Sequence, residues 1–535
     1  MATAATGGTR PRGRGNSQVT TITPCPDLST VPVSPGGGLS GGIQDPHPPP
    51  PGSCPSYPIL PVLPVRQASM PYTRASIHGD LTKLRSGASG LGNPACGLSI
   101  TLPVNDALTT DQISHLIDAA TDRPGDDPIF SLNSEAKARA AAGEDILNAT
   151  IGALMEDDGR LCVMPAVFTA YASVPPTKAA AYAPIAGDPP FLRAVIEDTF
   201  GAPTSKPGTL SAHSVAVATA GGTGALHHAI VNFLDPGQAL LTTEYFWTPY
   251  KIIANHTRRA VETFEMFDES GRFNLKAFEE SLTWSISRQG RALVIFNFPC
   301  HNPTGYSLDD EEWAGVANIV REAGRQAPVA FLNDLAYARY GREGSESWIQ
   351  HLDTMAETAV VLVAWSASKT FAQYGARIGA LVALANDADE RERIANAISF
   401  SCRGTWSNCN HLGLLAITEL LTNAELRQRV DAERAGLIRD LGARVEVFNR
   451  EAEALGLVYP RYEGGFFVSL FTPDAELTAA TMRAEGVYIV PMKGAVRVAL
   501  CSTPTPAIPR LVAALKRGID AAVDAARASG DTTSK

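Results

Sequence analysis

The stretch Ala359-Val-Val-Leu-Val-Ala-Trp-Ser-Ala-Ser-Lys-Thr370 joins seven consecutive apolar residues to two serines and a lysine. A continuous apolar run of this length is typical of a strand that is buried on both faces. Similar runs occur at 214–219, 239–243, 291–298 and 329–334, and longer helical patterns separate them. This alternation predicts an α/β fold whose mostly parallel sheet has helices on both sides.

The two ends of the chain differ from this central region. Residues 1–100 lack apolar periodicity, and the first 70 residues contain 14 of the 38 prolines. Such a segment cannot bury enough apolar surface to offset the entropy of ordering it, so we expect a disordered leader. Towards the other end, 411–457 is predicted to be helical, and strand candidates follow at 461–471, 487–491 and 495–502. These later elements predict a second, smaller α+β layer.

Charge and hydropathy argue against two classes of partner. The net charge is −10 and the isoelectric point is about 5.6. A nucleic-acid partner favours a basic patch, and a polybasic membrane anchor needs clustered lysines and arginines. No uninterrupted apolar run is long enough to cross a bilayer, so we expect a soluble protein.

The cysteines bear on metal binding and on location. All eight are scattered, with no CxxC pair and no spacing typical of zinc ligands, so we expect no metal site. Reduced thiols suit a cytoplasmic protein. The first 15 residues lack the apolar segment of a secretory signal, yet they contain three arginines and no acidic residue. An organellar transit peptide is therefore the alternative to the cytoplasm.

A lysine at the end of a buried strand is unusual, because burial disfavours the ammonium form. The same desolvation makes the amine of Lys369 a useful nucleophile towards an aldehyde. The hydroxyls of Ser366 and Ser368 flank this lysine and can bind a phosphate. Arg377, eight residues beyond Lys369, can add a bidentate phosphate contact.

Three further motifs follow strands. The glycine-rich loop at 220–225 opens a helix and can present N–H groups to a single phosphate. Asn302 lies in a turn after the run 291–298, and its amide can bond a cofactor oxygen. Asp334 fits the carboxylate that keeps a proton on the pyridine nitrogen of pyridoxal 5′-phosphate (PLP), and Tyr337 can donate to the cofactor's phenolic oxygen. Each motif stands at the carboxyl end of a strand, where open α/β sheets place ligands.

With these motifs in this order, the chain resembles the fold-type I PLP enzymes of the aspartate/aromatic aminotransferase family, over about residues 127–535. The resemblance implies a large domain with a mostly parallel seven-stranded sheet and a smaller α+β domain. It divides the chain into a leader (1–100), an N-terminal arm with part of the small domain (101–165), a large PLP-binding domain (166–430) and a small domain (431–535).

The resemblance also implies roles for the cofactor-binding residues. Lys369 corresponds to the lysine that forms the Schiff base and moves the proton, and Asp334 to the partner of the ring nitrogen. Trp247 matches the aromatic residue that stacks on the ring. Tyr337 and Asn302 correspond to the residues that bond the phenolic oxygen. The phosphate would be held by Gly222, Thr223, Ser366 and Arg377.

Four more positions concern the substrate and the oligomer. Arg497 matches the arginine that binds the substrate α-carboxylate, and Gly152 matches a substrate-covering loop. Arg403 matches the arginine that reaches a dicarboxylate's distal group from the neighbouring subunit. Tyr182 matches a tyrosine that reaches the neighbouring subunit's phosphate. If both hold, the active site needs a homodimer.

The resemblance predicts a transaminase that moves an amino group between a dicarboxylic or aromatic L-amino acid and a 2-oxo acid such as 2-oxoglutarate. Two departures bear on the reaction: Tyr250 stands three residues after Trp247, where the family often has a histidine that supports the aspartate, and Ser407-Asn-Cys-Asn410 replaces Ser-Asn-Pro-Pro. The alternative is a same-fold PLP enzyme for β- or γ-elimination, replacement or C–C bond formation. A DNA-binding regulator is disfavoured because residues 1–100 are too rich in proline and glycine for a helix-turn-helix.

Overall fold

The computed structural model describes residues 114–121, 123–125, 128–201 and 209–529. The chain divides into two units, 1–106 and 107–535, and all described residues belong to the second. The prediction of a disordered leader at 1–100 lies outside the described residues. No described helix is long and apolar enough to cross a membrane.

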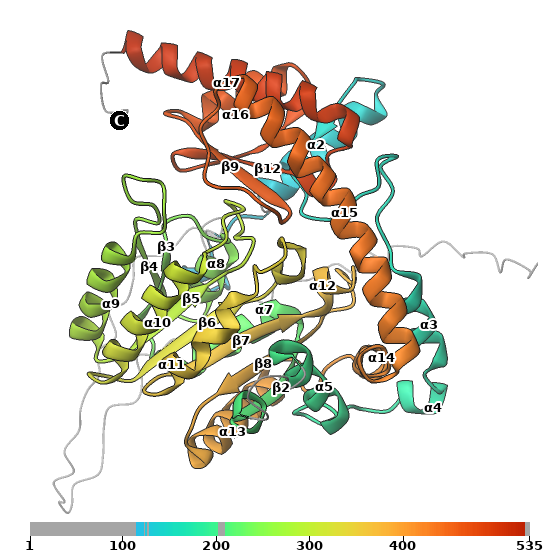
Figure 1. Cartoon of the computed structure of the whole chain (residues 1–535), viewed down its shortest axis with the longest axis vertical. Helices are drawn as coiled ribbons and strands as arrows, with labels where there is room; N and C mark the ends of the chain where they lie inside the picture. Colours follow the sequence, from blue (N-terminus) through green and yellow to red (C-terminus); the bar gives the residue numbers. More distant parts are fainter. Residues whose placement is uncertain (1–113, 122, 126–127, 202–208, 530–535) are drawn as a thin grey trace, which may run out of the picture. The chain divides into compact units, whose positions relative to one another are not determined.

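The centre of residues 107–535 is a seven-stranded sheet (Figure 1). Its strands, in spatial order, are β2 (Ser214–Ala220), β8 (Ile378–Leu384), β7 (Val360–Ser366), β6 (Val329–Asp334), β5 (Ala292–Phe296), β3 (Ala239–Thr243) and β4 (Ala260–Phe264). Only β8 runs antiparallel to its neighbours β2 and β7. The carboxyl ends of the other six strands therefore meet at one edge, which β8 enters at its amino end.

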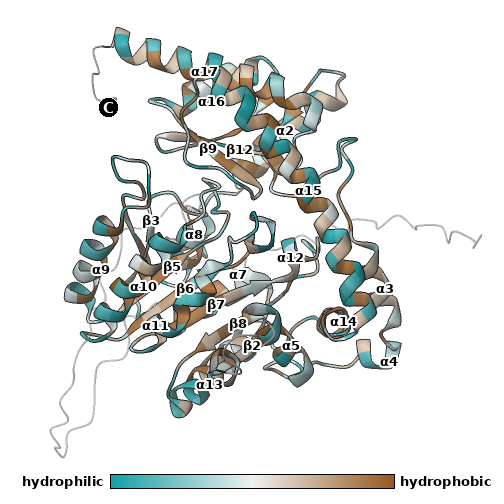
Figure 2. Cartoon of the chain, viewed as in Figure 1, coloured by the Kyte–Doolittle hydropathy of each residue, from teal (hydrophilic) through white to brown (hydrophobic). Residues whose placement is uncertain are grey.

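Buried strands divide their side chains between two cores. In β6, Val329 and Phe331 enter one apolar cluster, whereas Ala330 and Leu332 enter the other. This alternation is the two-residue period of a strand, and it explains why every residue of the apolar run is buried. Figure 2 shows apolar residues along the central strands and polar residues on the outer faces of the helices.

Helices cover both faces of the sheet. One cluster contains residues of α3 (Pro165–Ser173), α5 (Pro189–Phe200), α9 (Leu275–Gln289), α10 (Asp310–Gly324), α11 (Leu352–Ala356) and α14 (His411–Thr422). The other contains residues of α7 (Gly221–Phe233), α8 (Pro249–His256) and α13 (Ala388–Thr405). The short helices α4 (Pro176–Ala179), α6 (Thr209–Ala212) and α12 (Ala367–Thr370) also belong to this part, and α1 (Asp118–Thr121) is a short helix without buried residues. The predicted α/β class with a mostly parallel sheet is confirmed.

A second group of elements surrounds a three-stranded antiparallel sheet of order β11-β12-β9. The strands are β9 (Phe467–Phe471), β11 (Val490–Met492) and β12 (Ala495–Ala499), while β1 (Leu147–Asn148) pairs in parallel with β10 (Val487–Tyr488). The helices are α2 (Pro128–Ala141), α16 (Ala475–Ala484) and α17 (Ile508–Ala528). The three predicted strands of this region correspond to β9, to the two short strands β10 and β11, and to β12.

One long helix, α15 (Ala424–Ala454), serves both groups (Figure 1). Its first half contributes Leu426 and Val430 to a core of the large sheet, and its second half contributes Val445 and Phe448 to the core of the small one. Asn423 accepts hydrogen bonds from the first turn of α15 and separates it from α14. The predicted domain boundary at 430/431 falls inside this helix, and the domain boundaries stay a prediction.

Candidate active site

Most of the predicted site residues lie at the sheet edge where six strands end. Asp334 ends β6, and Lys369 lies in α12 directly after β7. Thr223 follows β2, and Asn302 lies in the loop after β5. Arg377 immediately precedes β8, so the one antiparallel strand brings it to the same edge, where Ala220 pairs with Ile378.

Arg377 and the start of α7 bring together groups that can bind an anion. Nη2 of Arg377 donates to Oγ1 of Thr223 (3.3 Å), and Nη1 donates to Oγ of Ser368 (3.4 Å). Gly221 has φ of +71°, and a Cβ there would lie 2.7 Å from Nη2 of Arg377. No described carboxylate forms an ion pair with Arg377. The guanidinium charge is therefore available to an anion, and the N-terminus of a helix favours the same kind of ligand.

Gly222 and Ser366 lie beside these anion-binding groups. A Cβ at Gly222 would lie 3.4 Å from Cβ of Ser366, so the two backbones approach closely. The hydroxyl of Ser366 accepts from the backbone N–H of Ser368 (3.2 Å), which fixes the turn before Lys369. The first turn of α7 has no side-chain cap, and its backbone N–H groups can face a ligand.

Asp334 is a buried carboxylate, 5% exposed, that forms no ion pair with a described residue. One of its oxygens accepts from the hydroxyl of Tyr250 (2.9 Å), and the other accepts from the backbone N–H of Ala336 (3.1 Å). No described lysine, arginine or histidine forms an ion pair with it. Burial raises the pKa of Asp334 above its ordinary value, while the two hydrogen bonds and the charge of Lys369 act in the opposite direction.

Lys369 and Tyr337 face each other at this edge. Nζ of Lys369 lies 5.3 Å from the centre of the Tyr337 ring. Burial lowers the pKa of Lys369, and Asp334 only partly offsets that effect. Asn302 donates to the hydroxyl of Tyr337 (3.2 Å), and the other amide atom of Asn302 is buried without a partner among the described residues. A polar atom in this state is expected beside a ligand.

The remaining predicted residues divide into two groups. Nη2 of Arg497 donates to the carbonyl of Thr150 (2.9 Å), and its guanidinium lies 4.4 Å from the ring centre of Phe467. Phe467 also packs against Tyr337, and a Cβ at Gly152 would lie only 2.5 Å from its ring. Arg497 and Gly152 therefore border the cluster.

Trp247 is partly buried in the loop after β3 and meets the ring of Tyr250 edge to face, with centres 5.7 Å apart. Arg403, on the contrary, is exposed at the end of α13 and donates to Ser407. Tyr182 is 90% exposed in the loop before α5. No hydrogen bond, ion pair or ring contact joins either residue to the described members of the cluster.

The structure adds two residues that the sequence did not reveal. Asn297, directly after β5, donates to the backbone carbonyl of Asp334 (2.7 Å) and accepts from the backbone N–H of Asn302 (2.9 Å). The hydroxyl of Tyr340 donates to the carbonyl of Lys369 (3.0 Å). The only signal for Asn297 was a single amide at the end of an apolar run, and Tyr340 had none.

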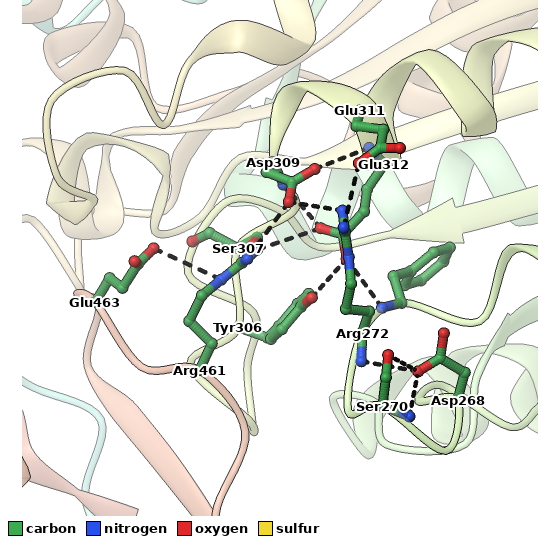
Figure 3. Close-up of polar contacts among 11 residues, drawn as sticks. Asp268, Ser270, Arg272, Tyr306, Ser307, Asp309, Glu311, Glu312, Arg461 and Glu463 are labelled. Carbon is green, nitrogen blue, oxygen red and sulfur yellow. Dashed lines mark hydrogen bonds and ion pairs between the residues drawn. The ribbon is translucent and has the colours of Figure 1, made fainter.

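A separate charged cluster braces the loop that follows Asn302 (Figure 3). Its centre is Glu312, 2% exposed, in the first turn of α10. Glu312 accepts from the hydroxyl of Tyr306 (2.6 Å) and from the backbone N–H groups of Phe273 and Asp309 (3.0 and 2.8 Å). It also pairs with Arg461 (3.2 Å) and Arg272 (3.5 Å). This cluster joins 268–273, 306–312 and 461–463. Among the described residues, no group of acids, histidines and cysteines could hold a metal.

Comparisons with known proteins agree with this fold. The model of the family "Aminotransferase class I and II" matches residues 144–515. The aromatic-amino-acid aminotransferase of Paracoccus denitrificans is 30% identical over 321 residues, which cover 58% of this chain and 78% of that protein. The aspartate aminotransferase of Pseudomonas aeruginosa is 28% identical over 320 residues, covering 59% and 77%.

Solved structures of aminotransferases share the fold of this chain. An aminotransferase from Anaerococcus prevotii superposes with a TM-score of 0.71 at 30% identity, covering 76% of this chain and all of that one. An aromatic-amino-acid aminotransferase from Burkholderia pseudomallei, covalently bound to pyridoxal phosphate, shares the fold with a TM-score of 0.62 at 23% identity, covering 75% and 98%.

The fold and these relatives define a PLP-dependent enzyme of fold type I. The chain belongs to the class I and II aminotransferase family, and it is a transaminase that moves amino groups between amino acids and 2-oxo acids. The predicted family, fold class and cofactor are thereby confirmed, and elimination, replacement or C–C bond formation is not favoured.

Proposed function

We propose that this transaminase accepts dicarboxylic and aromatic L-amino acids and returns the amino group to a 2-oxo acid such as 2-oxoglutarate. The observation that carries the proposal is the set of incompletely paired groups at one sheet edge. Asp334 and Arg377 carry opposite charges without ion-pair partners among the described residues, and Lys369 lies in α12 at the same edge. A zwitterionic aromatic phosphate matches such a set of donors and acceptors.

The residues fit PLP chemically. When bound, the cofactor accepts the electron pair that the substrate's Cα–H bond releases. Asp334 would keep a proton on the ring nitrogen, Asn302 and Tyr337 would bond the ring oxygen, and Trp247 would pack on the ring. The phosphate would be held by Gly222, Thr223, Ser366 and Arg377, because a guanidinium and hydroxyls at a helix N-terminus suit a dianion.

Lys369 is the residue that we propose holds the cofactor and moves the proton at the substrate Cα. Its lowered pKa favours the neutral amine, which is the form that can act as a nucleophile and as a base. The hydroxyl of Tyr340 fixes the carbonyl of Lys369, so the side chain starts from a defined backbone position. Nζ of Lys369 lies 5.3 Å from the ring centre of Tyr337, so the amine is next to the residue that would bond the ring oxygen.

Arg497 would bind the substrate α-carboxylate, since its guanidinium lies 4.4 Å from the ring centre of Phe467, which packs against Tyr337. A Cβ at Gly152 would lie only 2.5 Å from the Phe467 ring, so a glycine permits this close approach. Arg403 would recognise a distal carboxylate, as in a dicarboxylic substrate. Relatives named as aspartate and as aromatic-amino-acid aminotransferases support both substrate classes.

We further propose a homodimer in the cytoplasm. Tyr182 and Arg403 are both exposed, so each is free to reach the active site of a second copy. The five described cysteines are buried and free, which suits a reducing compartment. Sedimentation velocity checks the dimer, and cell fractionation checks the location.

Half-reactions test the substrate proposal. PLP-loaded protein is mixed separately with L-aspartate, L-glutamate, L-tyrosine and L-phenylalanine, with no oxo acid present. We expect the absorption band of the pyridoxal form to change into that of the pyridoxamine form, and 2-oxoglutarate to reverse the change. The variant Arg403→Ala should lose the reaction with aspartate while keeping that with phenylalanine. An unchanged spectrum with all four amino acids would overturn the substrate proposal.

A further inference from the structure

Tyr182 combines an exposed side chain with a backbone that is held on both sides. The side chain is 90% exposed. The carbonyl of Ala181 accepts from Nδ1 of His411 (2.8 Å), and the carbonyl of Ala183 accepts from Nδ2 of Asn408 (3.2 Å). Ordering a loop costs conformational entropy. This fixed backbone therefore indicates that the exposed phenol of Tyr182 needs a defined direction.

His411 also contacts the far end of the same loop. Its Nε2 lies 3.2 Å from Oδ2 of Asp188. Asp188 is the N-cap of α5, a position where an aspartate usually accepts from the first turn of its helix. Here its side chain accepts no capping hydrogen bond from the described residues of α5, and the carboxylate pairs with His411 instead. One histidine thus joins both ends of the loop 181–188.

The two partners of the His411 ring are both acceptors. A neutral imidazole has one donor and one acceptor nitrogen, so the two contacts form together when the ring is protonated and donates from both nitrogens. His411 is the first residue of α14, where the helix dipole disfavours a cation. The carboxylate of Asp188 offsets this unfavourable effect. The pair therefore keeps a positive charge at a place where the helix alone would not favour one.

We propose that His411 is a positioning residue for Tyr182: it holds the loop 181–188 so that the phenol reaches the cofactor phosphate of the neighbouring subunit. The inference rests on the homodimer and on the role of Tyr182, both proposed above. The loop belongs to one subunit and the phosphate to the other. Loss of His411 should therefore impair the neighbour's active site and spare the site of its own subunit.

Binding of PLP to the apo-dimer measures the proposed contact without catalysis. Tyr182→Phe should weaken PLP binding about tenfold, the effect of losing one hydrogen bond to a charged group. His411→Ala should weaken it by about three- to tenfold, because the phenol is present but no longer held in place. The matched control is His351→Ala. His351 also pairs with an acidic residue at the start of a helix, Asp310, outside the proposed site, so this variant should bind PLP like the wild type.

Hybrid dimers show in which subunit's site His411 acts, and two different affinity tags isolate them. The first hybrid joins a Lys369→Ala subunit to a His411→Ala subunit. Its one competent lysine receives an intact loop from the other subunit, so the PLP concentration for half-maximal activity should equal that of the wild type. The second hybrid joins a subunit with both changes to a wild-type subunit, and this concentration should rise about three- to tenfold. A structural role of His411 within its own subunit would give the reverse pattern.

The outcomes separate the inference from the proposal on which it rests. If Tyr182→Phe binds PLP like the wild type, the proposed role of Tyr182 fails and the inference with it. If Tyr182→Phe has its effect but His411→Ala behaves like His351→Ala, or if the hybrids give the reverse pattern, only the inference about His411 is overturned. Should His411→Ala not fold, Asp188→Ala replaces it, because it removes the ion pair at the other end of the loop. Unchanged PLP binding in Asp188→Ala would then overturn the inference.

Discussion

Asp334 and Glu312 are both buried carboxylates next to the loop of Asn302, but their surroundings differ. Glu312 accepts from Tyr306 and two backbone N–H groups, and the guanidinium groups of Arg272 and Arg461 lie within ion-pair distance. Asp334 has one hydroxyl and one backbone N–H, and no described cation pairs with it. The protein itself therefore satisfies Glu312, while Asp334 is satisfied only in part.

This difference separates a structural charge from a functional one. A buried ion repays its desolvation only when opposite charges and hydrogen bonds surround it, as they do around Glu312. A buried ion left without a counter-charge destabilises the fold and persists where a ligand completes it. The same contrast applies to Asp198, which contacts Arg339, Arg427 and Trp365, and to Arg377, which has no described acidic partner.

The largest expected effect is a loss of catalytic activity when a residue of the proposed active site is changed. Lys369→Ala should lower the transamination rate by about 10²–10⁴-fold or more, because it removes the group that we propose moves the proton at Cα. The same change should not lower the stability of the apo-protein, since burial disfavours the charged form of this lysine. Steady-state kinetics and chemical denaturation of the apo-protein check the two halves. A large loss of apo-protein stability would place Lys369 with Glu312 as a structural residue.

Glu312→Ala should have the opposite profile. It leaves the hydroxyl of Tyr306 and two backbone N–H groups without their acceptor and removes one of the carboxylates that pair with each guanidinium, at a cost of about 3–5 kcal/mol in the free energy of unfolding. The matched control is Glu311→Ala, because Glu311 is exposed and contacts only Arg272 in the same cluster, and its cost should stay within about 0.5 kcal/mol. Urea denaturation of the apo-proteins measures both values. Equal costs for the two variants would mean that the cluster is not a structural centre.

Much of the fold and part of the site could be predicted from local patterns. An apolar run with a two-residue period marks a strand between two cores, as β6 shows, and parallel strands bring their carboxyl ends to one edge. Asp334 and Lys369 follow from this rule because each stands at the end of such a run. Their chemical roles stay predictions, together with those of Arg403 and Tyr182, whose proposed site lies on a second copy of the chain.

The supporting contacts could not be predicted in the same way. Glu312 brings together segments more than a hundred residues apart, and no periodicity in the sequence relates Arg272 to Arg461. Tyr250 was noticed only as a departure from a family pattern, and its contact with Asp334 depends on the packing of α8 against the sheet. The predicted helical stretch 411–457 contains α14 and α15, but no local pattern in the sequence shows that α15 packs against two separate cores.

The smallest expected effect tests the comparison most directly. Asp334→Asn should raise the stability of the apo-protein at neutral pH by on the order of 1 kcal/mol, because a neutral amide replaces a buried charge without an ion-pair partner. The pKa of Asp334 is raised above its ordinary value of 3.8, so between these two pKa values the folded state binds more protons than the unfolded state. Stability of the wild type therefore falls as pH rises through that window. The gain in stability from Asp334→Asn should be absent below this pH window and complete above it.

Glu312→Gln, the matched change in the other carboxylate, should be destabilising at neutral pH. Denaturation of the three apo-proteins across this pH range would show whether the two carboxylates respond with opposite signs. A loss of stability in Asp334→Asn at neutral pH would mean that the protein alone satisfies this carboxylate, and the distinction between the two sites would not hold.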